Sequence, residues 1–379
     1  MDTKISGEQI KKANKPQAPK QQQNKAYVDK AVMPSKIFLA IVAMTLVLII
    51  SFSAAFGVVL LVGGDSSVSD NTPSGNNSTP GGNGGNKNPS SVIGGGTSVG
   101  GNSLGKTNPK RQSYISTRSS SVASISDACD VDNVILVDLD SYQSVAEKKA
   151  DTRIYPASMT KVMSLLVACE NLKSLKTKLK VSKAALDYAY RMEGSLFGVQ
   201  QGDTLTTQDL LYLTSYYSDT VAVIMLAEHI AGSEAGFVQL MNKKAQSLGL
   251  SNTNFDNCTG LHSDNNYTTC REMAAIMAYA LENPLCAELL TNTNLYKFST
   301  DSGSYTLWSP SWYRDRLSAQ PKLSTVTVKG GKTGYIDESG YCLVSYAIGT
   351  NSGRKYIQVV VGDTKKSDNV KYVYNNFAD

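Results

Sequence analysis

The stretch Ser158-Met159-Thr160-Lys161 decides the fold of this 379-residue chain, together with two shorter strings, Ser218-Asp219-Thr220 and Lys332-Thr333-Gly334. Each string is common by itself. In this order and at this wide spacing, they indicate a nucleophilic serine with a lysine one helical turn away, a second hydroxyl on a loop, and a strand whose lysine binds a carboxylate.

The first string lies where a helix is expected to begin, because Pro156-Ala157 precedes a long apolar run. Lys161 follows Ser158 by three positions and therefore shares its helical face. A lysine serves as the base for a serine hydroxyl when burial and a neighbouring positive charge lower its pKa, and Lys332 is the expected source of that charge. The alternative is that Ser158 only caps the helix and Lys161 is solvated.

The second string falls between two helical patterns, where a loop directs Ser218 toward a cleft. Its hydroxyl then passes a proton between Lys161 and a leaving amine. The alternative is that Ser218 is an ordinary helix cap before Thr220-Val221-Ala222.

The third string lies between a β-rich segment and a glycine-containing turn. Lys332 and Thr333 offer a charge and a hydroxyl to a carboxylate, and Gly334 lets a substrate backbone approach an exposed strand edge. The alternative is a β-turn with a solvated lysine.

Over about residues 125–379 the chain resembles the low-molecular-weight penicillin-binding proteins, specifically the serine D-alanyl-D-alanine carboxypeptidases. The resemblance implies an α/β (α+β) fold like that of β-lactamases and transpeptidases, with an antiparallel sheet flanked by helices and a helical subdomain. The stretches that carry it, besides the second string, are Tyr155-Pro156-Ala157-Ser158-Met159-Thr160-Lys161, Gly202-Asp203, Asp209-Leu210-Leu211-Tyr212, Leu226 to Gly232, Asn257 to His262, Thr268-Thr269, Lys332-Thr333-Gly334-Tyr335 and Gly340-Tyr341.

The resemblance also implies a role for each site residue. Ser158 attacks the penultimate D-Ala carbonyl of a peptidoglycan stem pentapeptide, Lys161 accepts its proton, and Ser218 relays a proton to the leaving D-Ala. Lys332 and Thr333 hold the terminal carboxylate, and the backbone N–H groups of Ser158 and Tyr335 form an oxyanion hole. Water then hydrolyses the acyl-enzyme, and β-lactams acylate the same serine.

One position departs from the family pattern, since Thr220 stands where the family has asparagine. Threonine is shorter and lacks an amide donor. Thr220 is a candidate substrate-binding residue, but it cannot orient Lys161 and the substrate amide as asparagine would. Two expectations stay open: the activity is lower, or another polar group takes the place of the asparagine.

Three other functions have weaker support in the sequence. A class A β-lactamase needs a glutamate on a loop after the second motif, and residues 250–262 contain none. A catalytically weak or inactive wall-binding protein is favoured only by Thr220. A Ser-His-Asp triad has only His229 and His262 to draw on, and no G-x-S-x-G elbow accompanies a serine.

The periodicity of residues 113–379 predicts strands at both ends and helices between them, so that distant strands close into one antiparallel sheet. The expected strands are 134–138, 326–328, 341–348 and 356–361. One expected helix begins near Ser158. The other expected helices cover residues 207–216, 221–231, 234–248, 271–282 and 366–377.

The first part of the chain has a different composition. Residues 1–36 are polar and predict a disordered cytoplasmic tail, whereas residues 37–62 are almost unbroken apolar and predict a transmembrane helix. Residues 63–112 are a Gly/Ser/Asn-rich linker with an end-to-end distance on the order of 40 Å. The lysines before the span place the N-terminus in the cytoplasm and the domain, residues 113–379, outside the membrane.

Charge and cysteine content exclude other classes. The net charge is +5, and residues 1–36 hold eight lysines, so the globular part is not expected to bind nucleic acid. The six cysteines have no metal-type spacing and only two histidines exist, which predicts no metal site and no cofactor. Cys258 and Cys270 flank one loop and form a disulfide only if the compartment is oxidising.

Overall fold

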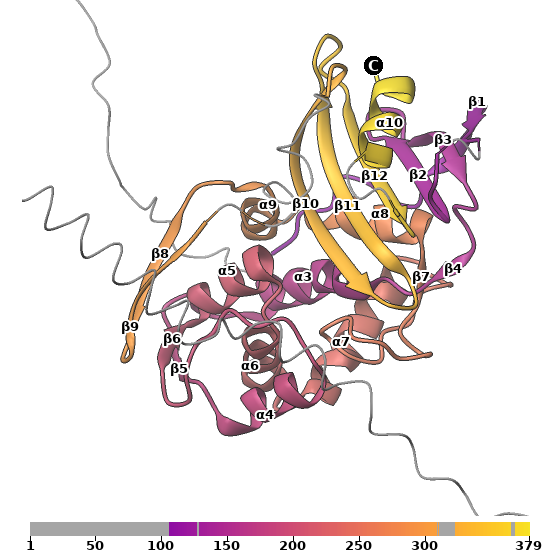
Figure 1. Cartoon of the computed structure of the whole chain (residues 1–379). Helices are drawn as coiled ribbons and strands as arrows, with labels where there is room; N and C mark the ends of the chain where they lie inside the picture. Colours follow the sequence, from indigo (N-terminus) through magenta and orange to yellow (C-terminus); the bar gives the residue numbers. More distant parts are fainter. Residues whose placement is uncertain (1–105, 127–128, 309, 311–322, 365–367) are drawn as a thin grey trace, which may run out of the picture. The chain divides into compact units, whose positions relative to one another are not determined.

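The computed structural model describes residues 106–126, 129–308, 310, 323–364 and 368–379 (Figure 1). The expected tail, the expected transmembrane helix and the linker up to residue 105 lie outside the described residues and stay predictions. Within the described ranges, no single helix is both long enough and apolar enough to cross a membrane. Two pairs of consecutive helices have that length and composition only when the two helices are counted together, and each pair is sharply bent: Thr220–Ala231 with Glu234–Ser247, and Cys270–Ala280 with Pro284–Thr291.

Six strands form the main sheet in the order β1-β3-β2-β12-β11-β10. They are β1 (Thr117–Ser124), β2 (Asn133–Asp138), β3 (Gln143–Lys148), β10 (Val326–Ile336), β11 (Gly340–Gly349) and β12 (Lys355–Val361). Pairing is antiparallel from β3 through β10, which confirms that strands from the two ends of the domain join in one sheet.

The expectation of a wholly antiparallel sheet is wrong at one edge, because β1 pairs with β3 in parallel. In the hairpin β2–β3, strand β3 lies between β1 and β2. The edge strand β1 is therefore next to β3, which runs parallel to it. The sheet is therefore mixed.

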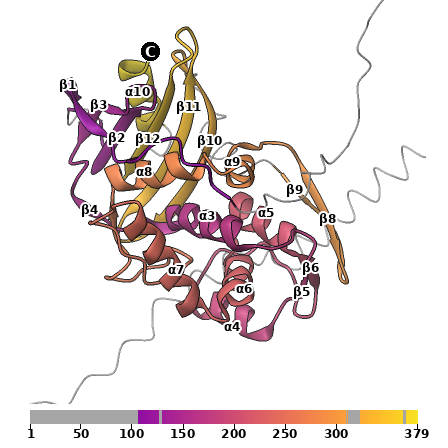
Figure 2. The same ribbon diagram turned by 180° about the vertical axis from the view of Figure 1, so that it is seen from behind.

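Both faces of the sheet are covered, as Figures 1 and 2 show from opposite sides. Successive residues of a strand point to opposite faces. In β2, Val134 and Leu136 join a core with α10 (Asp368–Phe377), whereas Ile135 and Val137 join the core that contains α8 (Cys270–Ala280). This double burial explains why β2 reads as a continuous apolar run.

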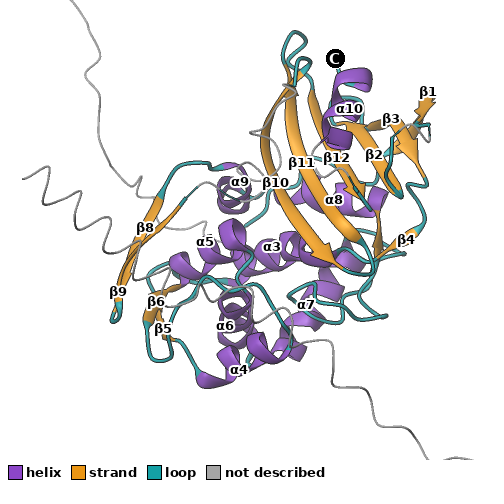
Figure 3. Cartoon of the chain, in the orientation of Figure 1, coloured by secondary structure: helices purple, strands orange, loops and turns teal. Residues whose placement is uncertain are grey.

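The helical part of the domain gathers on the α8 side of the sheet (Figure 3). It contains the predicted helices α3 (Lys161–Asn171), α5 (Thr207–Tyr217), α6 (Thr220–Ala231) and α7 (Glu234–Ser247). The helices and strands expected from periodicity are present, most with small shifts of their ends. The exception is the strand expected at 326–328, which extends to Ile336, so that Lys332-Thr333-Gly334 lies within β10 and not between a strand and a turn. The expected architecture of a sheet with helices on both faces and a helical part is thus confirmed.

Several short elements were not anticipated. Two are helices, α4 (Lys183–Arg191) and α9 (Pro284–Thr291). The others are two-stranded sheets: β4 (Arg153–Ile154) with β7 (Thr268–Thr269), β5 (Lys178–Lys180) with β6 (Thr204–Thr206), and β8 (Tyr296–Thr300) with β9 (Gly303–Leu307). Cys258 and Cys270 are both buried, and no disulfide joins them.

Candidate active site

The turn that carries Ser158 is a short 3-10 helix, η1 (Ala157–Thr160), which continues directly into α3. Ala157 has a φ of 48°, a left-handed conformation that costs a non-glycine residue free energy. Ser158 is half-buried, whereas the residues on either side of it are buried. The helix therefore begins where the sequence predicts, with the serine presented at its start.

Lys161 lies beneath this serine. Its Nζ is 3.2 Å from Ser158 Oγ and donates to the Thr259 carbonyl oxygen at 2.6 Å. The side chain is 1 % exposed. Burial lowers the pKa of Lys161 to about 8, although the thiol of Cys258 and the carboxyl of Asp219 act in the opposite direction. A neutral amine is therefore accessible near neutral pH, and it is placed to accept the serine proton.

The second string forms the turn between α5 and α6. Ser218 ends α5 with a φ of 58°, and Asp219 caps α6 by accepting from Ala222 N at 2.7 Å. Ser218 is thus a loop residue, as predicted, and the helix cap is its neighbour. Ser218 Oγ accepts from Lys332 Nζ at 3.0 Å.

Lys332 is 1 % exposed and lies in β10, the strand at the other edge of the sheet. Its Nζ also donates to the Thr333 carbonyl oxygen at 3.0 Å. Burial, together with the nearby charge of Lys161, holds the pKa of Lys332 well below its usual value. The charge effect thus acts from Lys161 on Lys332. The pKa of Lys161 is lowered by burial and not by the charge of Lys332, contrary to the expectation from the sequence.

Two glycines press against the serine turn. A Cβ atom at Gly334 would lie 2.9 Å from Ala157 Cβ and 3.0 Å from Ser158 N. A Cβ atom at Gly260, whose φ is +78°, would lie 1.9 Å from the Ala157 carbonyl oxygen. The turn is therefore held between β10 and the loop that follows α7, and only glycine fits at either contact.

Thr220 occupies a different environment from the rest of the set. Its side chain is fully buried, and its Oγ1 has no hydrogen-bond partner in the part of the chain that the structure describes. A Cβ atom at Gly194 would lie 2.4 Å from that oxygen, and Thr220 N donates to the Ser195 carbonyl at 2.8 Å. Thr220 thus packs under the loop after α4, and the polar group that holds Lys161 is the Thr259 carbonyl.

The structure therefore brings together the four side chains on which the predicted chemistry depends, in two pairs: Ser158 with Lys161, and Ser218 with Lys332. Thr333 is half-buried beside them, and Tyr335 is 53 % exposed with its hydroxyl donating to Asp337 at 3.1 Å. Asp219, for which no role of its own was predicted, is a buried carboxyl whose Oδ2 accepts from Phe197 N at 2.6 Å. Burial raises the pKa of Asp219.

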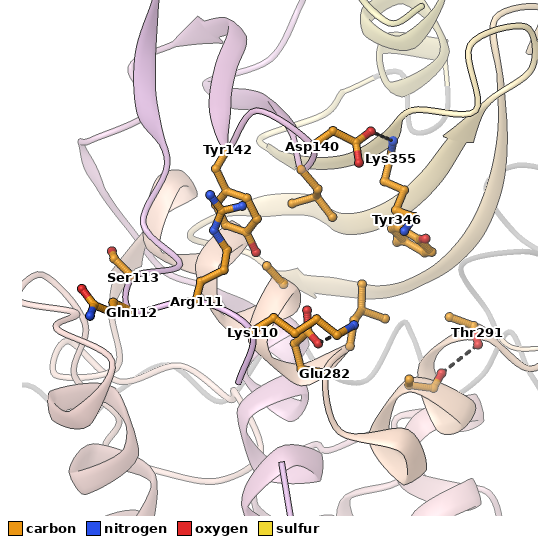
Figure 4. A pocket seen from close by; sticks show the side chains of 14 residues that line it. Lys110, Arg111, Gln112, Ser113, Asp140, Tyr142, Glu282, Thr291, Tyr346 and Lys355 are labelled. Carbon is orange, nitrogen blue, oxygen red and sulfur yellow. Dashed lines mark hydrogen bonds and ion pairs between the residues drawn. The ribbon is translucent and has the colours of Figure 1, made fainter. Parts of the chain in front are cut away.

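The described residues include a cavity away from this site but no candidate metal cluster. No group of three or more His, Cys, Asp or Glu side chains among them is arranged to hold a metal ion. A cavity of about 860 Å³ lies elsewhere, between Lys110–Ser113, the β2–β3 turn, the ends of α8 and α9, and β11 and β12 (Figure 4). None of the predicted site residues lines it.

Comparison with known proteins agrees with this geometry. The family model of the D-alanyl-D-alanine carboxypeptidases, peptidase S11, matches residues 119–365. The chain is 33 % identical over 248 residues to the D-alanyl-D-alanine carboxypeptidase DacF of Bacillus subtilis, covering 63 % of this chain and 59 % of that protein. It is 32 % identical over 249 residues to DacC of Escherichia coli, covering 63 % and 57 %.

The chain thus spans less than two thirds of the length of these curated relatives. Among solved structures, the Streptomyces K15 DD-transpeptidase superposes with a TM-score of 0.58 at 25 % identity, covering 65 % of this chain and 96 % of that one. The family match and the residues of the site agree: this chain belongs to the peptidase S11 family of D-alanyl-D-alanine carboxypeptidases.

Proposed function

We propose that this protein is a membrane-anchored serine D,D-carboxypeptidase that releases the terminal D-Ala from peptidoglycan stem pentapeptides through an acyl-enzyme. The observation that carries the proposal is the buried Lys161 amine 3.2 Å from the hydroxyl of the half-buried Ser158. A serine becomes nucleophilic only when a base takes its proton, and a lysine with a pKa of about 8 suits that task near neutral pH.

Acylation follows from the two pairs. Ser158 Oγ bonds to the carbonyl carbon of the penultimate D-Ala while its proton passes to neutral Lys161. The backbone N–H groups of Ser158 and Tyr335 stabilise the oxyanion. The peptide bond to the terminal D-Ala then breaks, and Ser218, bound by Lys332 Nζ at 3.0 Å, relays the proton held by Lys161 to the leaving nitrogen. Water then hydrolyses the ester bond to Ser158, which returns a proton to Ser158 Oγ.

The substrate is expected to bind along β10. Among the described residues this strand is at the edge of the sheet, where a peptide can add as a further strand. Lys332 and Thr333 then face the terminal carboxylate, and Gly334 keeps the strand within reach of Ser158. The same contacts suit the carboxylate and acyl group of a β-lactam.

The first experiment is labelling with a fluorescent penicillin, followed by mass spectrometry of the labelled peptide and a D-Ala release assay on a synthetic pentapeptide. We expect a stable label on Ser158 that Ser158→Ala abolishes, together with D-Ala release. Rapid drug turnover would point to a β-lactamase instead. No label and no D-Ala release would support a non-catalytic wall-binding protein.

The pH dependence of labelling tests the base. The reaction requires the neutral form of Lys161, whose pKa is about 8. Below that pKa, the neutral fraction increases about tenfold for each unit by which the pH is raised. We therefore expect the acylation rate to rise about tenfold between pH 6 and 7 and to level off above pH 8. A rate that stays flat from pH 6 to 9 would show that another group accepts the proton.

Membrane attachment is proposed from residues 37–62, whose apolar run is long enough to span the hydrocarbon core. The eight lysines of residues 1–36 favour a cytoplasmic N-terminus, which places the domain on the outer side. Protease added to intact cells should then remove the domain, whereas a chain lacking residues 1–62 should not fractionate with membranes.

A further inference from the structure

The side chain of Asn257 organises the loop that follows α7. Its Oδ1 accepts three hydrogen bonds: from Thr259 N at 3.2 Å, from Thr259 Oγ1 at 3.0 Å and from Gly260 N at 2.7 Å. Its Nδ2 donates to the Leu261 carbonyl at 2.9 Å. The side-chain amide of Asn257, a residue that is 9 % exposed, therefore makes hydrogen bonds to four polar groups of Thr259, Gly260 and Leu261.

The same short loop touches both members of the nucleophile–base pair. The Thr259 carbonyl accepts from Lys161 Nζ at 2.6 Å, a shorter contact than the 3.2 Å between that nitrogen and Ser158 Oγ. Gly260 lies against the Ala157 carbonyl, one residue before the serine. A change in the conformation of this loop would therefore move the contacts of Lys161 and of the serine turn together.

Contacts from other segments hold the start of the loop as well. Ser164 Oγ donates to the Cys258 carbonyl at 2.7 Å, and Cys258 N donates to Glu234 Oε1 at 3.2 Å. These contacts fix the residue next to Asn257 but not the orientation of the Thr259 peptide group. The hydrogen bond from Gly260 N to Asn257 Oδ1 is made by the same peptide group as the Thr259 carbonyl, so together with the contact between Gly260 and Ala157 it sets that orientation.

We propose that Asn257 is a positioning residue for Lys161, acting through the Thr259 carbonyl. The proposal rests on the proposed function, since it assigns Lys161 the part of the base. A long lysine side chain has several rotamers, and a fixed acceptor selects the one that directs the amine at Ser158. A displacement of about 1 Å in a catalytic group costs up to about 100-fold in rate.

The test compares Asn257→Ala with Asn257→Asp. Alanine removes the acceptor, so we expect the acylation rate constant to fall about 10- to 100-fold with little change in penicillin binding. Aspartate keeps the acceptor oxygen and the Asx-type turn, so the rate constant at high pH should stay within a few-fold of the original. Its added negative charge should raise the pKa of Lys161 and move the pH profile to higher pH.

Matched controls are Asn254→Ala and Asn254→Asp. Asn254 lies in the same loop, but its Nδ2 donates to the Asn265 carbonyl at 2.6 Å, on an exposed part of the loop. The alanine change should leave the rate constant unaltered, and the aspartate change should move the pH profile much less than Asn257→Asp. A merely structural role of Asn257 would lower thermal stability without this difference in pH profile.

A direct titration of the Lys161 amine by NMR, assigned with Lys161→Arg, keeps the inference separate from the proposed function. If the unaltered protein is never acylated but Asn257→Asp still raises the Lys161 titration midpoint more than Asn254→Asp, the proposed function fails and the positioning role stands. Equal midpoints in the two aspartate variants, or an unaltered acylation rate constant in a folded Asn257→Ala, would overturn the inference. Should Asn257→Ala not fold, the comparison of the two aspartate variants decides.

Discussion

Replacing Lys161 with methionine is expected to lower the rate of Ser158 acylation about 100- to 10,000-fold, the range that a positioned general base contributes. Methionine has nearly the length of the lysine stem and fills the same buried space. It cannot accept the Ser158 proton. The measurement is the second-order rate of labelling by a fluorescent penicillin, at pH values from 6 to 9.

The same change should leave the protein folded. Lowering the pKa of Lys161 from 10.5 to about 8 corresponds to about 3 kcal/mol of unfavourable burial, and methionine removes that cost. Losing the donor to the Thr259 carbonyl costs about 1–3 kcal/mol. The two effects nearly cancel, so we expect the free energy of unfolding at pH 7 to change by less than about 2 kcal/mol.

A matched control is Lys371→Met in α10. Lys371 is also 1 % exposed, but it lies in the helix on the opposite face of the sheet from the helical part. Its loss should leave the labelling rate unaltered. If Lys161→Met keeps the labelling rate of the original protein, or if both lysine variants lose it alike, Lys161 is not the base.

The parts of the fold that could be predicted from the sequence are the ones with a strong buried pattern. β2 is buried on both faces, and α3 and α8 are almost wholly buried, so their apolar runs are unambiguous. β1 shows the opposite case. It is a Ser/Thr-rich edge strand with mostly exposed side chains, and its pairing depends on where the β2–β3 hairpin folds rather than on its own residues.

The site divides in a similar way. The roles proposed for Ser158, Lys161 and Lys332 depend on their side chains, so residue type and spacing are enough to select them. The partner that fixes Lys161 is a backbone carbonyl, which every residue has, and only the folded loop reveals that it belongs to Thr259. The packing of Thr220 under Gly194 is likewise a contact between segments that the sequence does not bring together.

The contact between Gly260 and the serine turn depends on the absence of a side chain. Gly260 has a φ of +78°, and its Cα hydrogen occupies the direction in which a Cβ would meet the Ala157 carbonyl oxygen at 1.9 Å and its carbon at 2.5 Å. Both atoms are backbone, so neither can rotate away. Relief requires that the loop and the turn separate, which carries the Thr259 carbonyl away from Lys161.

We therefore expect Gly260→Ala to lower the acylation rate by up to about 100-fold and to cost about 2–4 kcal/mol in the free energy of unfolding, the sum of overpacking and left-handed strain. Gly249→Ala separates the two contributions, since Gly249 has a φ of +74° with no atom within 4 Å of the added Cβ. That variant should cost only about 1 kcal/mol and acylate normally. The measurements are urea unfolding and penicillin labelling. Equal effects of the two variants on stability and on the labelling rate would mean that the left-handed strain alone causes them. A larger rate loss in Gly260→Ala locates the effect in the contact with Ala157, because that contact is what distinguishes the two positions.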